Sequence, residues 1–223
     1  MNNKMFRLED VSSIPNSQIL DMYSNHINPA LLDIFKLLGF RDLDVSHAKG
    51  VYIYLHSGRK ILDMTSSFGV LVLGHNHPVV IEAEKFCHKN DLIDMQKLGP
   101  NRLQSVLAYN LSQLLPGELT VATLSVSGAE ANEAAIKLVT KSQKDKRKKF
   151  IIRMEGAYHG KTHGALSLTD SEGFGDGFLV GIPKENIITI PHGDLSIFKN
   201  IVNDHTFSDG KNDIIAIFVE PMG

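Results

Sequence analysis

Two hydrophobic periodicities alternate along the chain. Apolar residues recur at helical spacing in residues 19–38, from residue 79 onward, in residues 103–115 and in an alanine-rich stretch that runs through residue 139. These patterns predict helices that each bury one face. Pro29 predicts a break or restart inside the first helix, and Pro78 suits the first turn of the second.

Short apolar runs between these helices predict strands. They are a hairpin at 50–63 with its turn at Ser57-Gly58, and runs at 124–126, 150–154, 186–190 and 213–220. The last run is continuously apolar, which is typical of a central parallel strand buried on both faces. Strands that alternate with helical segments predict an α/β fold with a mainly parallel sheet.

The junction between residues 124–126 and the alanine-rich helix is the first candidate site. Ser127 is suited to cap this helix, and the Glu130 carboxylate can reach back to the Ser127 amide as a capping box. Gly128 leaves the backbone open to a ligand, and a helix N-terminus offers unpaired amides and the positive end of a dipole. The turn therefore suits a phosphate or another anion. A well-capped structural helix is the alternative that this stretch alone leaves open.

This turn matches neither of two common nucleotide-binding patterns. The P-loop pattern G-x-x-x-x-G-K-[ST] and the dinucleotide pattern G-x-G-x-x-G are both absent from the chain. The anion, if one binds, is therefore held by a different kind of turn.

A second candidate site follows the strand predicted at 150–154. Tyr158 and His159 lie between Gly156 and Gly160, in the loop that leaves the carboxyl end of this strand. The carboxyl ends of strands are where α/β sheets bind ligands. The alternative is a loop tyrosine that caps the core.

Composition and charge exclude several classes of protein. The 223 residues are 43% hydrophobic and 22% charged, and the formal net charge of -2 provides no electrostatic surface for nucleic acid or a membrane. The basic run at 144–149 predicts a solvated loop. Cys87 is the sole cysteine, and no run has the length of a signal peptide core or a membrane span. We therefore expect a cytoplasmic protein.

No metal site is expected at the two histidine pairs. His75 and His77 do not share a helical face and have no carboxylate or cysteine close in sequence. Gly160 disfavours a continuous helix between His159 and His163, and H-E-x-x-H is absent.

Five motifs occur in one order from about residue 45 to the end of the chain. They are G-R at 58–59 with L-D at 62–63, G-H-N-H-P-V at 74–79, S-G-A-E-A-N-E at 127–133 with K-L at 137–138, Y-H-G-K-T-H-G-A-L-S at 158–167, and E-P-M-G at 220–223. In this order and spacing they resemble the class III pyridoxal-phosphate aminotransferases, the family of ornithine, putrescine and acetylornithine aminotransferases. The resemblance implies the α/β fold type I of pyridoxal-phosphate-dependent transferases, present in part: an N-terminal segment and the first part of the mainly parallel sheet of the large domain. It places part of the small domain at 1–62 and a partial large domain at 63–223.

The resemblance implies pyridoxal 5'-phosphate as the cofactor and assigns residues to it. The positions that would hold the phosphate are Ser127, Gly128 and Ala129. Tyr158 would stack on the pyridine ring, which a flat side chain can do while leaving the other face of the ring open. His159 would lie beside the cofactor, and Glu220 would lie near cofactor and substrate.

Two groups that this family needs are not found in the chain. They are a lysine that forms a Schiff base with the cofactor and an aspartate on the pyridine nitrogen, and both follow the Glu-Pro motif in the family. The sequence given ends at Gly223, and none of Lys49, Lys137 and Lys161 stands in the sequence context of that lysine. We therefore expect an N-terminal fragment without a catalytic residue of its own, inactive alone. The resemblance also implies that later strands separate residues 124–126 from the strand ending at Glu220, so that apolar sheet edges would be exposed.

The whole protein is expected to transfer an amino group from an amine or amino acid to a 2-oxo acid, as a homodimer with active sites at the subunit interface. Two alternatives remain open. One is a non-catalytic cofactor-binding or dimerisation module that pairs with a separately encoded C-terminal half. The other is an aminomutase or decarboxylase of the same fold. The sequence does not identify the donor or the acceptor.

Overall fold

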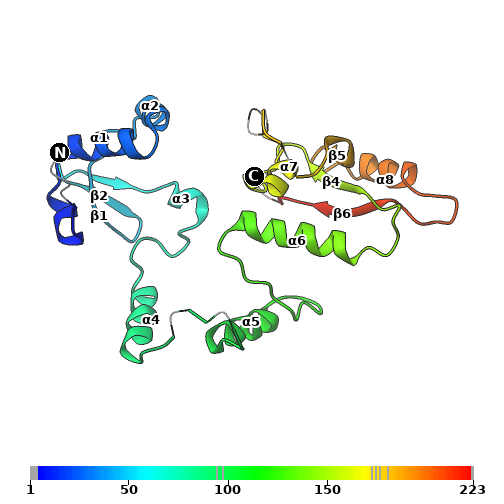
Figure 1. The fold of residues 1–223 in the computed structure, drawn as a ribbon, viewed down its shortest axis with the longest axis horizontal. Helices are drawn as coiled ribbons and strands as arrows, with labels where there is room; N and C mark the ends of the chain where they lie inside the picture. The colour runs from blue at the N-terminus through cyan, green and yellow to red at the C-terminus, as the bar shows by residue number, and fades with distance from the viewer. Residues whose placement is uncertain are drawn as a thin grey trace. The chain divides into compact units, whose positions relative to one another are not determined.

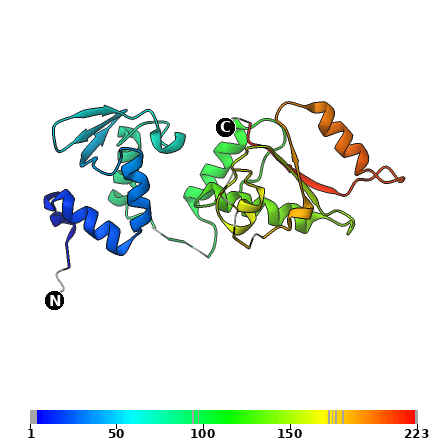
Figure 2. The same ribbon diagram turned by 90° about the horizontal axis from the view of Figure 1, so that it is seen from above.

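The chain folds as two compact units. The computed structural model describes residues 5–93, 95–96, 98–171, 173, 175, 177–179 and 181–221. The units are Met1–Leu98 and Gly99–Gly223 (Figure 1 and Figure 2). The domain boundary that the sequence predicts between residues 62 and 63 lies inside the first unit and stays a prediction about the whole protein.

The first unit begins with a pair of helices. The 3-10 helix η1 Leu8–Ser13 precedes α1 Asn16–His26 and α2 Pro29–Leu37. The side chain of Asn28 caps α2 by accepting a hydrogen bond from the Leu31 amide at 3.2 Å. Pro29 occupies the first turn of α2, where a missing N–H is tolerated. The break predicted at Pro29 is confirmed.

A three-stranded antiparallel sheet follows, with the order β1-β2-β3. The strands are β1 Val45–Lys49, β2 Tyr52–Leu55 and β3 Lys60–Leu62. β2 and β3 form the predicted hairpin, with Ser57-Gly58 between them. The sequence pattern does not predict β1, because the apolar residues of V-S-H-A-K do not alternate with polar ones.

A left-handed turn follows this sheet. The short helix α3 Ser66–Gly69 contains three consecutive residues other than glycine with positive φ: Ser66 at 44°, Ser67 at 53° and Phe68 at 57°. Each such residue costs about 1–2 kcal/mol relative to a right-handed conformation. The next helix, α4 Pro78–Lys89, begins at the predicted proline.

Asp63 fixes the left-handed turn from its N-terminal side. Its Oδ1 accepts hydrogen bonds from the Thr65 amide at 3.0 Å, the Thr65 hydroxyl at 2.8 Å and the Ser66 amide at 2.9 Å. Its Oδ2 lies 2.9 Å from Nε2 of His75. The Thr65 hydroxyl contributes most to lowering the pKa of Asp63 to about 2. His75 therefore has a carboxylate partner after all, 12 residues away in sequence.

The second unit is built around a three-stranded parallel sheet with the order β5-β4-β6. Its strands are β4 Phe150–Met154, β5 Ile187–Ile190 and β6 Ile214–Phe218. Its helices are α5 Arg102–Leu114, α6 Gly128–Ser142, α7 His163–Leu168, η2 Lys184–Asn186 and α8 Leu195–Asp204. The predicted α/β class with a mainly parallel sheet is confirmed.

Helices cover both faces of this parallel sheet (Figure 1). On one face, Ile136 of α6 and Leu168 of α7 pack with Ile151 of β4. On the other face, three strand residues pack against α8; they are Ile152, Ile190 and Ile214. Neighbouring residues of a strand point to opposite faces, so β4 supplies both cores. Ile152 is 0% exposed and forms the centre of the second core.

Two strand predictions are wrong in the structure. Residues 124–126 form no strand but an exposed irregular segment, because no strand in the described part of the chain pairs with them. Residues 213–220 do contain β6, yet it lies at an edge of the sheet and not at its centre. Among the described residues, only β4 pairs with β6 as a neighbouring strand, and Ile217 is 41% exposed. β6 therefore combines the apolar sequence of a central strand with an open edge.

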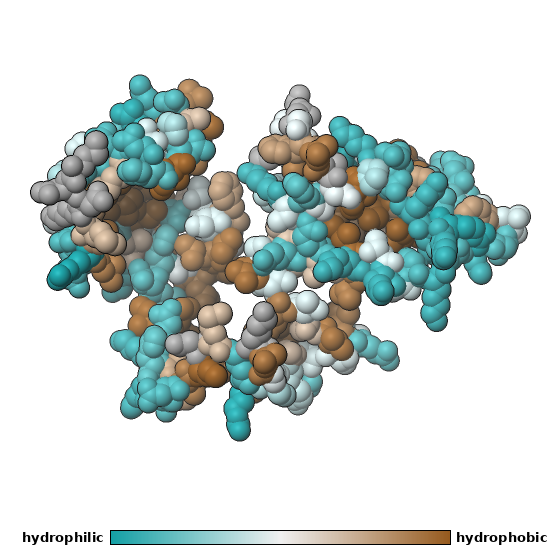
Figure 3. All heavy atoms as spheres, in the orientation of Figure 1, coloured by the Kyte–Doolittle hydropathy of each residue, from teal (hydrophilic) through white to brown (hydrophobic). Residues whose placement is uncertain are grey.

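Apolar side chains also lie on the surface of two helices, α4 of the first unit and α5 of the second (Figure 3). The exposed residues are Val79, Val80 and Phe86 on α4, and Leu103, Val106, Leu107, Tyr109 and Leu114 on α5. Apolar residues that gather on a surface in this way commonly mark a contact with another protein surface.

The described ranges contain neither a membrane-spanning helix nor a cluster of metal-binding side chains. None of the helices there combines the length and the apolar character that crossing a bilayer requires. Within the same ranges, no three side chains of histidine, cysteine, aspartate or glutamate gather as a group that could hold a metal ion.

Candidate functional site

Two segments of the second unit line an open pocket of about 600 Å³. It lies where the N-terminus of α6 meets the loop that follows β4. Its lining residues are Ser127, Gly128, Ala129, Asn132, Tyr158, His159, Gly160, Lys161 and Thr162. The structure thus brings together residues 127–129 with residues 158–159, all of which the sequence singled out.

The N-terminus of α6 forms the predicted capping box. The Ser127 hydroxyl accepts a hydrogen bond from the Glu130 amide at 3.2 Å, and Oε2 of Glu130 accepts one from the Ser127 amide at 3.2 Å. Among the described residues, the amides of Gly128 and Ala129 have no hydrogen-bond acceptor. A Cβ at Gly128 would meet no atom within 4 Å, so the approach to these amides is open. Two unpaired amides at a helix N-terminus form a seat for an anion.

Glu220 ties the end of β6 to the loop that follows β4. Its Oε2 accepts a hydrogen bond from the Tyr158 amide at 2.7 Å. β4 and β6 are parallel neighbours, so their carboxyl ends lie at the same edge of the sheet. The sixth residue singled out by the sequence therefore contacts the backbone of the pocket, and the Tyr158 side chain is 47% exposed.

His159 lies in the wall of this pocket and its imidazole is buried. Its amide donates to the Thr169 hydroxyl at 3.0 Å, and its ring meets the Phe218 ring edge-on at a centroid distance of 5.9 Å. Among the described residues, its buried Nε2 has no hydrogen-bond partner. Burial lowers the pKa of His159 below its ordinary value of 6.5, so the imidazole is neutral at neutral pH. A buried polar atom without a partner is rare in native proteins and calls for a partner from outside these residues.

His159 predicts a pH dependence of stability. Its pKa is lower in the folded chain than in the unfolded chain, so the unfolded chain binds a proton first as the pH falls. The neutral His159 contributes fully to the free energy of unfolding above pH 6.5. This contribution is lost as the pH falls from 6.5 through the lowered pKa of the folded chain. We expect urea unfolding, followed by circular dichroism, to show this loss in the parent chain and to show less of it in His159→Gln. His26→Gln, at an exposed histidine of α1, is the control and should keep the loss. Identical pH profiles for the parent and His159→Gln would contradict the prediction.

Gly160 allows the loop to lie directly on α6. Its φ is 126°, which side chains other than glycine rarely adopt. A Cβ at this position would lie 2.6 Å from Cβ of Ala129 and 3.2 Å from Cβ of Ala165. The close approach of loop and helix therefore depends on the absence of a side chain.

The sequence did not assign a role to two residues of α6: Asn132, which lines the pocket, and its neighbour Glu133. Nδ2 of Asn132 donates to the His159 carbonyl at 2.6 Å. Oε1 of Glu133 accepts hydrogen bonds from the amides of Gly164 and Ala165 at 2.8 and 3.2 Å. A signal was available, because both are polar residues on a half-buried face of an alanine-rich helix.

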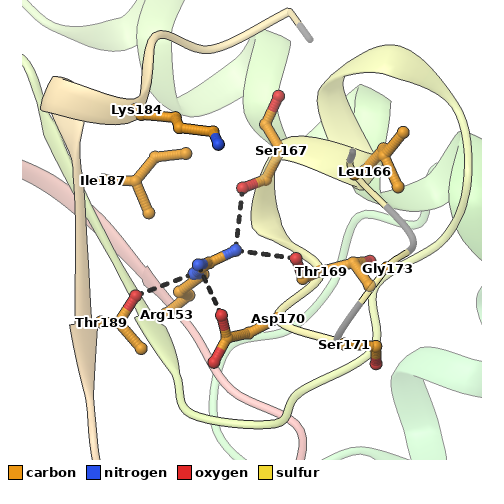
Figure 4. Close-up of a pocket in the computed structure, with 11 residues that line it drawn as sticks. Arg153, Leu166, Ser167, Thr169, Asp170, Ser171, Gly173, Lys184, Ile187 and Thr189 are labelled. Atoms are coloured by element: carbon orange, nitrogen blue, oxygen red, sulfur yellow. Dashed lines mark hydrogen bonds and ion pairs between the residues drawn. The ribbon is translucent and has the colours of Figure 1, made fainter. Parts of the chain in front are cut away.

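A second pocket, of about 430 Å³, surrounds Arg153 of β4 (Figure 4). Its guanidinium donates to the Thr189 hydroxyl at 3.0 Å and the Thr169 carbonyl at 2.7 Å, and it forms an ion pair with Asp170 at 2.6 Å. These partners come from β5 and from the segment after α7. Because its charge is neutralised by Asp170 and its donors are used within the protein, Arg153 serves to hold these segments together.

Known proteins resemble the chain over most of its length. The family model described as aminotransferase class-III matches residues 39–223. An omega-aminotransferase from Paracoccus denitrificans is 23% identical, and the match covers 81% of this chain and 43% of that one with a TM-score of 0.66. The ornithine aminotransferase from Toxoplasma gondii ME49 is 17% identical, with coverages of 98% and 49% and a TM-score of 0.73. The PMP-bound form of an aminotransferase from Vibrio fluvialis is 21% identical, with coverages of 85% and 45% and a TM-score of 0.66.

These similarities confirm the predicted fold class. The solved structures are pyridoxal-phosphate-dependent transaminases of fold type I, and the chain spans less than half the length of each of these three. Class III aminotransferases use pyridoxal phosphate, as the sequence resemblance implied. Since the family model matches 39–223, well over half of the residues, the chain belongs to the class III aminotransferases.

Proposed function

We propose that this chain holds pyridoxal phosphate in an aminotransferase that transfers an amino group from an amine or amino acid to a 2-oxo acid. The observation that carries the proposal is one pocket that combines the unpaired amides of Gly128 and Ala129 with Tyr158 and His159. When bound, pyridoxal phosphate supplies an electron-withdrawing ring that stabilises the carbanion left when a proton is removed beside the amino group.

The N-terminus of α6 fits the phosphate group of this cofactor. The amides of Gly128 and Ala129 are available to donate, and the Ser127 hydroxyl can donate its own proton while it accepts from the Glu130 amide. The helix dipole adds a favourable interaction with a doubly charged phosphate. The open space in front of Gly128 allows the oxygens to approach the backbone.

The loop after β4 fits the ring of the cofactor. Tyr158 lines the pocket and is 47% exposed, so a flat ligand in the pocket can reach its ring and stack on it. His159 presents a neutral imidazole whose buried Nε2 needs a polar partner. Glu220 holds the Tyr158 backbone in place through the 2.7 Å hydrogen bond to its amide.

We further propose that the 223 residues do not turn over substrate by themselves. Lys161 lines the pocket, but none of Lys49, Lys137 and Lys161 stands in the sequence context of a Schiff-base lysine.

We also propose a homodimer for the whole enzyme, which the exposed apolar residues of α4 and α5 support. A cytoplasmic location is supported by the free thiol of Cys87.

The phosphate seat is tested by comparing two serines of the same helix. Ser127→Ala removes the hydroxyl at the N-cap of α6, and Ser142→Ala removes an exposed hydroxyl at the other end. We expect Ser127→Ala to weaken the binding of pyridoxal phosphate about tenfold, the effect of one hydrogen bond to a charged group, and Ser142→Ala to leave it unchanged. The change in ligand absorbance on titration gives the affinities, and inorganic phosphate should compete. Equal affinities for the two variants, or no competition, would contradict the proposed seat.

A reduction experiment tests the absence of a Schiff-base lysine in these residues. After borohydride treatment of the chain with pyridoxal phosphate, mass mapping should find no single lysine labelled at the stoichiometry of the chain. A stoichiometric label on one lysine, or steady turnover of an amine and a 2-oxo acid, would overturn the proposal that the chain alone is inactive.

A further inference from the structure

One face of α6 holds the loop that follows β4. Ala129, Asn132 and Glu133 are spaced three and four positions apart, so they lie on one side of the helix. Ala129 lies against Gly160, Asn132 binds the His159 carbonyl, and Glu133 binds amides at the start of α7. The helix that presents the anion-binding amides thus also contacts the loop that carries Tyr158.

The Asn132 contact is a short hydrogen bond to the backbone of the loop. Its Nδ2 donates to the His159 carbonyl at 2.6 Å, and Asn132 itself is half-buried in the pocket wall. Because the bond is made to a backbone carbonyl, it orients the peptide between His159 and Gly160 without using the imidazole of His159. It therefore fixes where the imidazole and the preceding tyrosine stand relative to α6.

The Glu133 carboxylate binds three donors, one at the end of this loop and two at the start of α7. Oε1 accepts from the amides of Gly164 at 2.8 Å and Ala165 at 3.2 Å. The Thr162 side chain also donates to this carboxylate, and that bond contributes most to lowering the pKa of Glu133. A Cβ at Gly164 would collide with the Glu133 carboxylate, so the helix start lies directly on it. The end of the loop is thereby fixed to α6 as well.

The core packing of α6 does not depend on these two polar residues. Ile136, one turn further along, packs with Ile151, Leu168 and Phe218. Substitutions at 132 and 133 therefore alter the polar contacts while the apolar anchor of the helix remains.

We propose that Asn132 and Glu133 are positioning residues that hold the Tyr158 to Thr162 loop at a fixed separation from the anion-binding amides of Gly128 and Ala129. The inference rests on the proposed function, because the fixed separation is the one between the phosphate and the ring of a single ligand. Holding two binding elements in place before the ligand arrives reduces the ordering that binding must impose. The fixed separation does not change the affinity of a ligand that binds only to the amides of Gly128 and Ala129.

Two ligands distinguish binding at the N-terminus of α6 from binding that also involves the loop. Inorganic phosphate reports on the seat alone, and pyridoxine 5'-phosphate reports on seat and ring without forming a Schiff base. For the full chain, we expect pyridoxine 5'-phosphate to bind more tightly than phosphate. Asn132→Asp replaces the donor by an acceptor of the same shape, which repels the His159 carbonyl. We expect it to weaken pyridoxine 5'-phosphate about tenfold and to leave the phosphate affinity unchanged within about twofold.

Asn110→Asp is the matched control, because it makes the same change at an exposed position of α5. It should leave both affinities unchanged. Glu133→Gln keeps an acceptor oxygen for the Gly164 amide and should retain most of the preference for pyridoxine 5'-phosphate, whereas Glu133→Ala should lose it. Isothermal titration gives the affinities, and circular dichroism shows whether each variant is folded.

The titrations test the proposed function and the positioning role separately. If the parent chain binds pyridoxine 5'-phosphate no more tightly than phosphate, the proposed function fails. If the parent shows the preference and folded Asn132→Asp and Glu133→Ala keep it, the positioning role is wrong. If both ligands weaken equally in these variants, the residues only maintain the helix, which also overturns the inference. Should Asn132→Asp be unfolded, the Glu133→Ala and Glu133→Gln pair decides.

Discussion

Gly160→Ala is expected to lower the free energy of unfolding by about 2–5 kcal/mol and to abolish the preference for a ligand with a ring. The new Cβ would lie 2.6 Å from Cβ of Ala129 and 3.2 Å from Cβ of Ala165. Both neighbours are short side chains close to the backbone, so the loop and α6 must separate. The backbone conformation at φ 126° adds strain to this collision. Urea unfolding and titration with pyridoxine 5'-phosphate measure the two effects.

Gly156→Ala is the control for this substitution. Gly156 lies in the same loop with a φ of 70°, and a Cβ there would meet no atom within 4 Å. The control therefore carries backbone strain without a collision and should cost about 1 kcal/mol. If the two variants lose equal stability and equal affinity, the contact between Gly160 and Ala129 does not organise the site.

Ile152→Ala is expected to lower the free energy of unfolding by about 2–5 kcal/mol. Ile152 is 0% exposed in β4, the central strand of the order β5-β4-β6, and it packs in one cluster with Ile190, Ile214 and residues of α8. Removing its side chain leaves a cavity whose neighbours lie on three different strands and a helix, which limits their collapse. Chemical denaturation monitored by circular dichroism measures the loss.

The matched change at the sheet edge should cost much less. Ile217 lies on β6 and is 41% exposed, so Ile217→Ala removes a smaller buried area and should cost about 1 kcal/mol or less. A loss at position 217 as large as that at position 152 would show that the edge strand is buried in solution by another surface.

Features that depend on neighbours in sequence could be predicted from the sequence. The capping box of Ser127 and Glu130 involves residues three positions apart, and the structure forms it as expected. The break at Pro29 and the strand at 150–154 follow from proline chemistry and from an uninterrupted apolar run. The resemblance to the family then grouped residues that the spacing alone could not bring together, such as Tyr158 and Glu220.

Features that depend on distant partners could not be predicted in this way. Residues 124–126 have the composition of a strand, but a strand exists only where another one bonds its backbone. The prediction that β6 is a central strand was wrong for the same reason. An apolar run indicates that both faces of a strand are buried, but it does not indicate how many strands pair with it. Asn132 and Glu133 were missed because their partners lie 27 and 31 residues away.

The left-handed turn at Ser66, Ser67 and Phe68 is stabilised by a residue that lies outside it. None of these three residues favours a left-handed conformation, and together they oppose it by about 3–6 kcal/mol. The carboxylate of Asp63, which belongs to none of them, binds the amides that enter the turn. The hydrogen bonds of Asp63 therefore stabilise the entrance to this turn from an upstream position. The preferences of the three turn residues, taken one by one, would predict a right-handed turn, so a prediction of this turn has to include Asp63, three positions before Ser66.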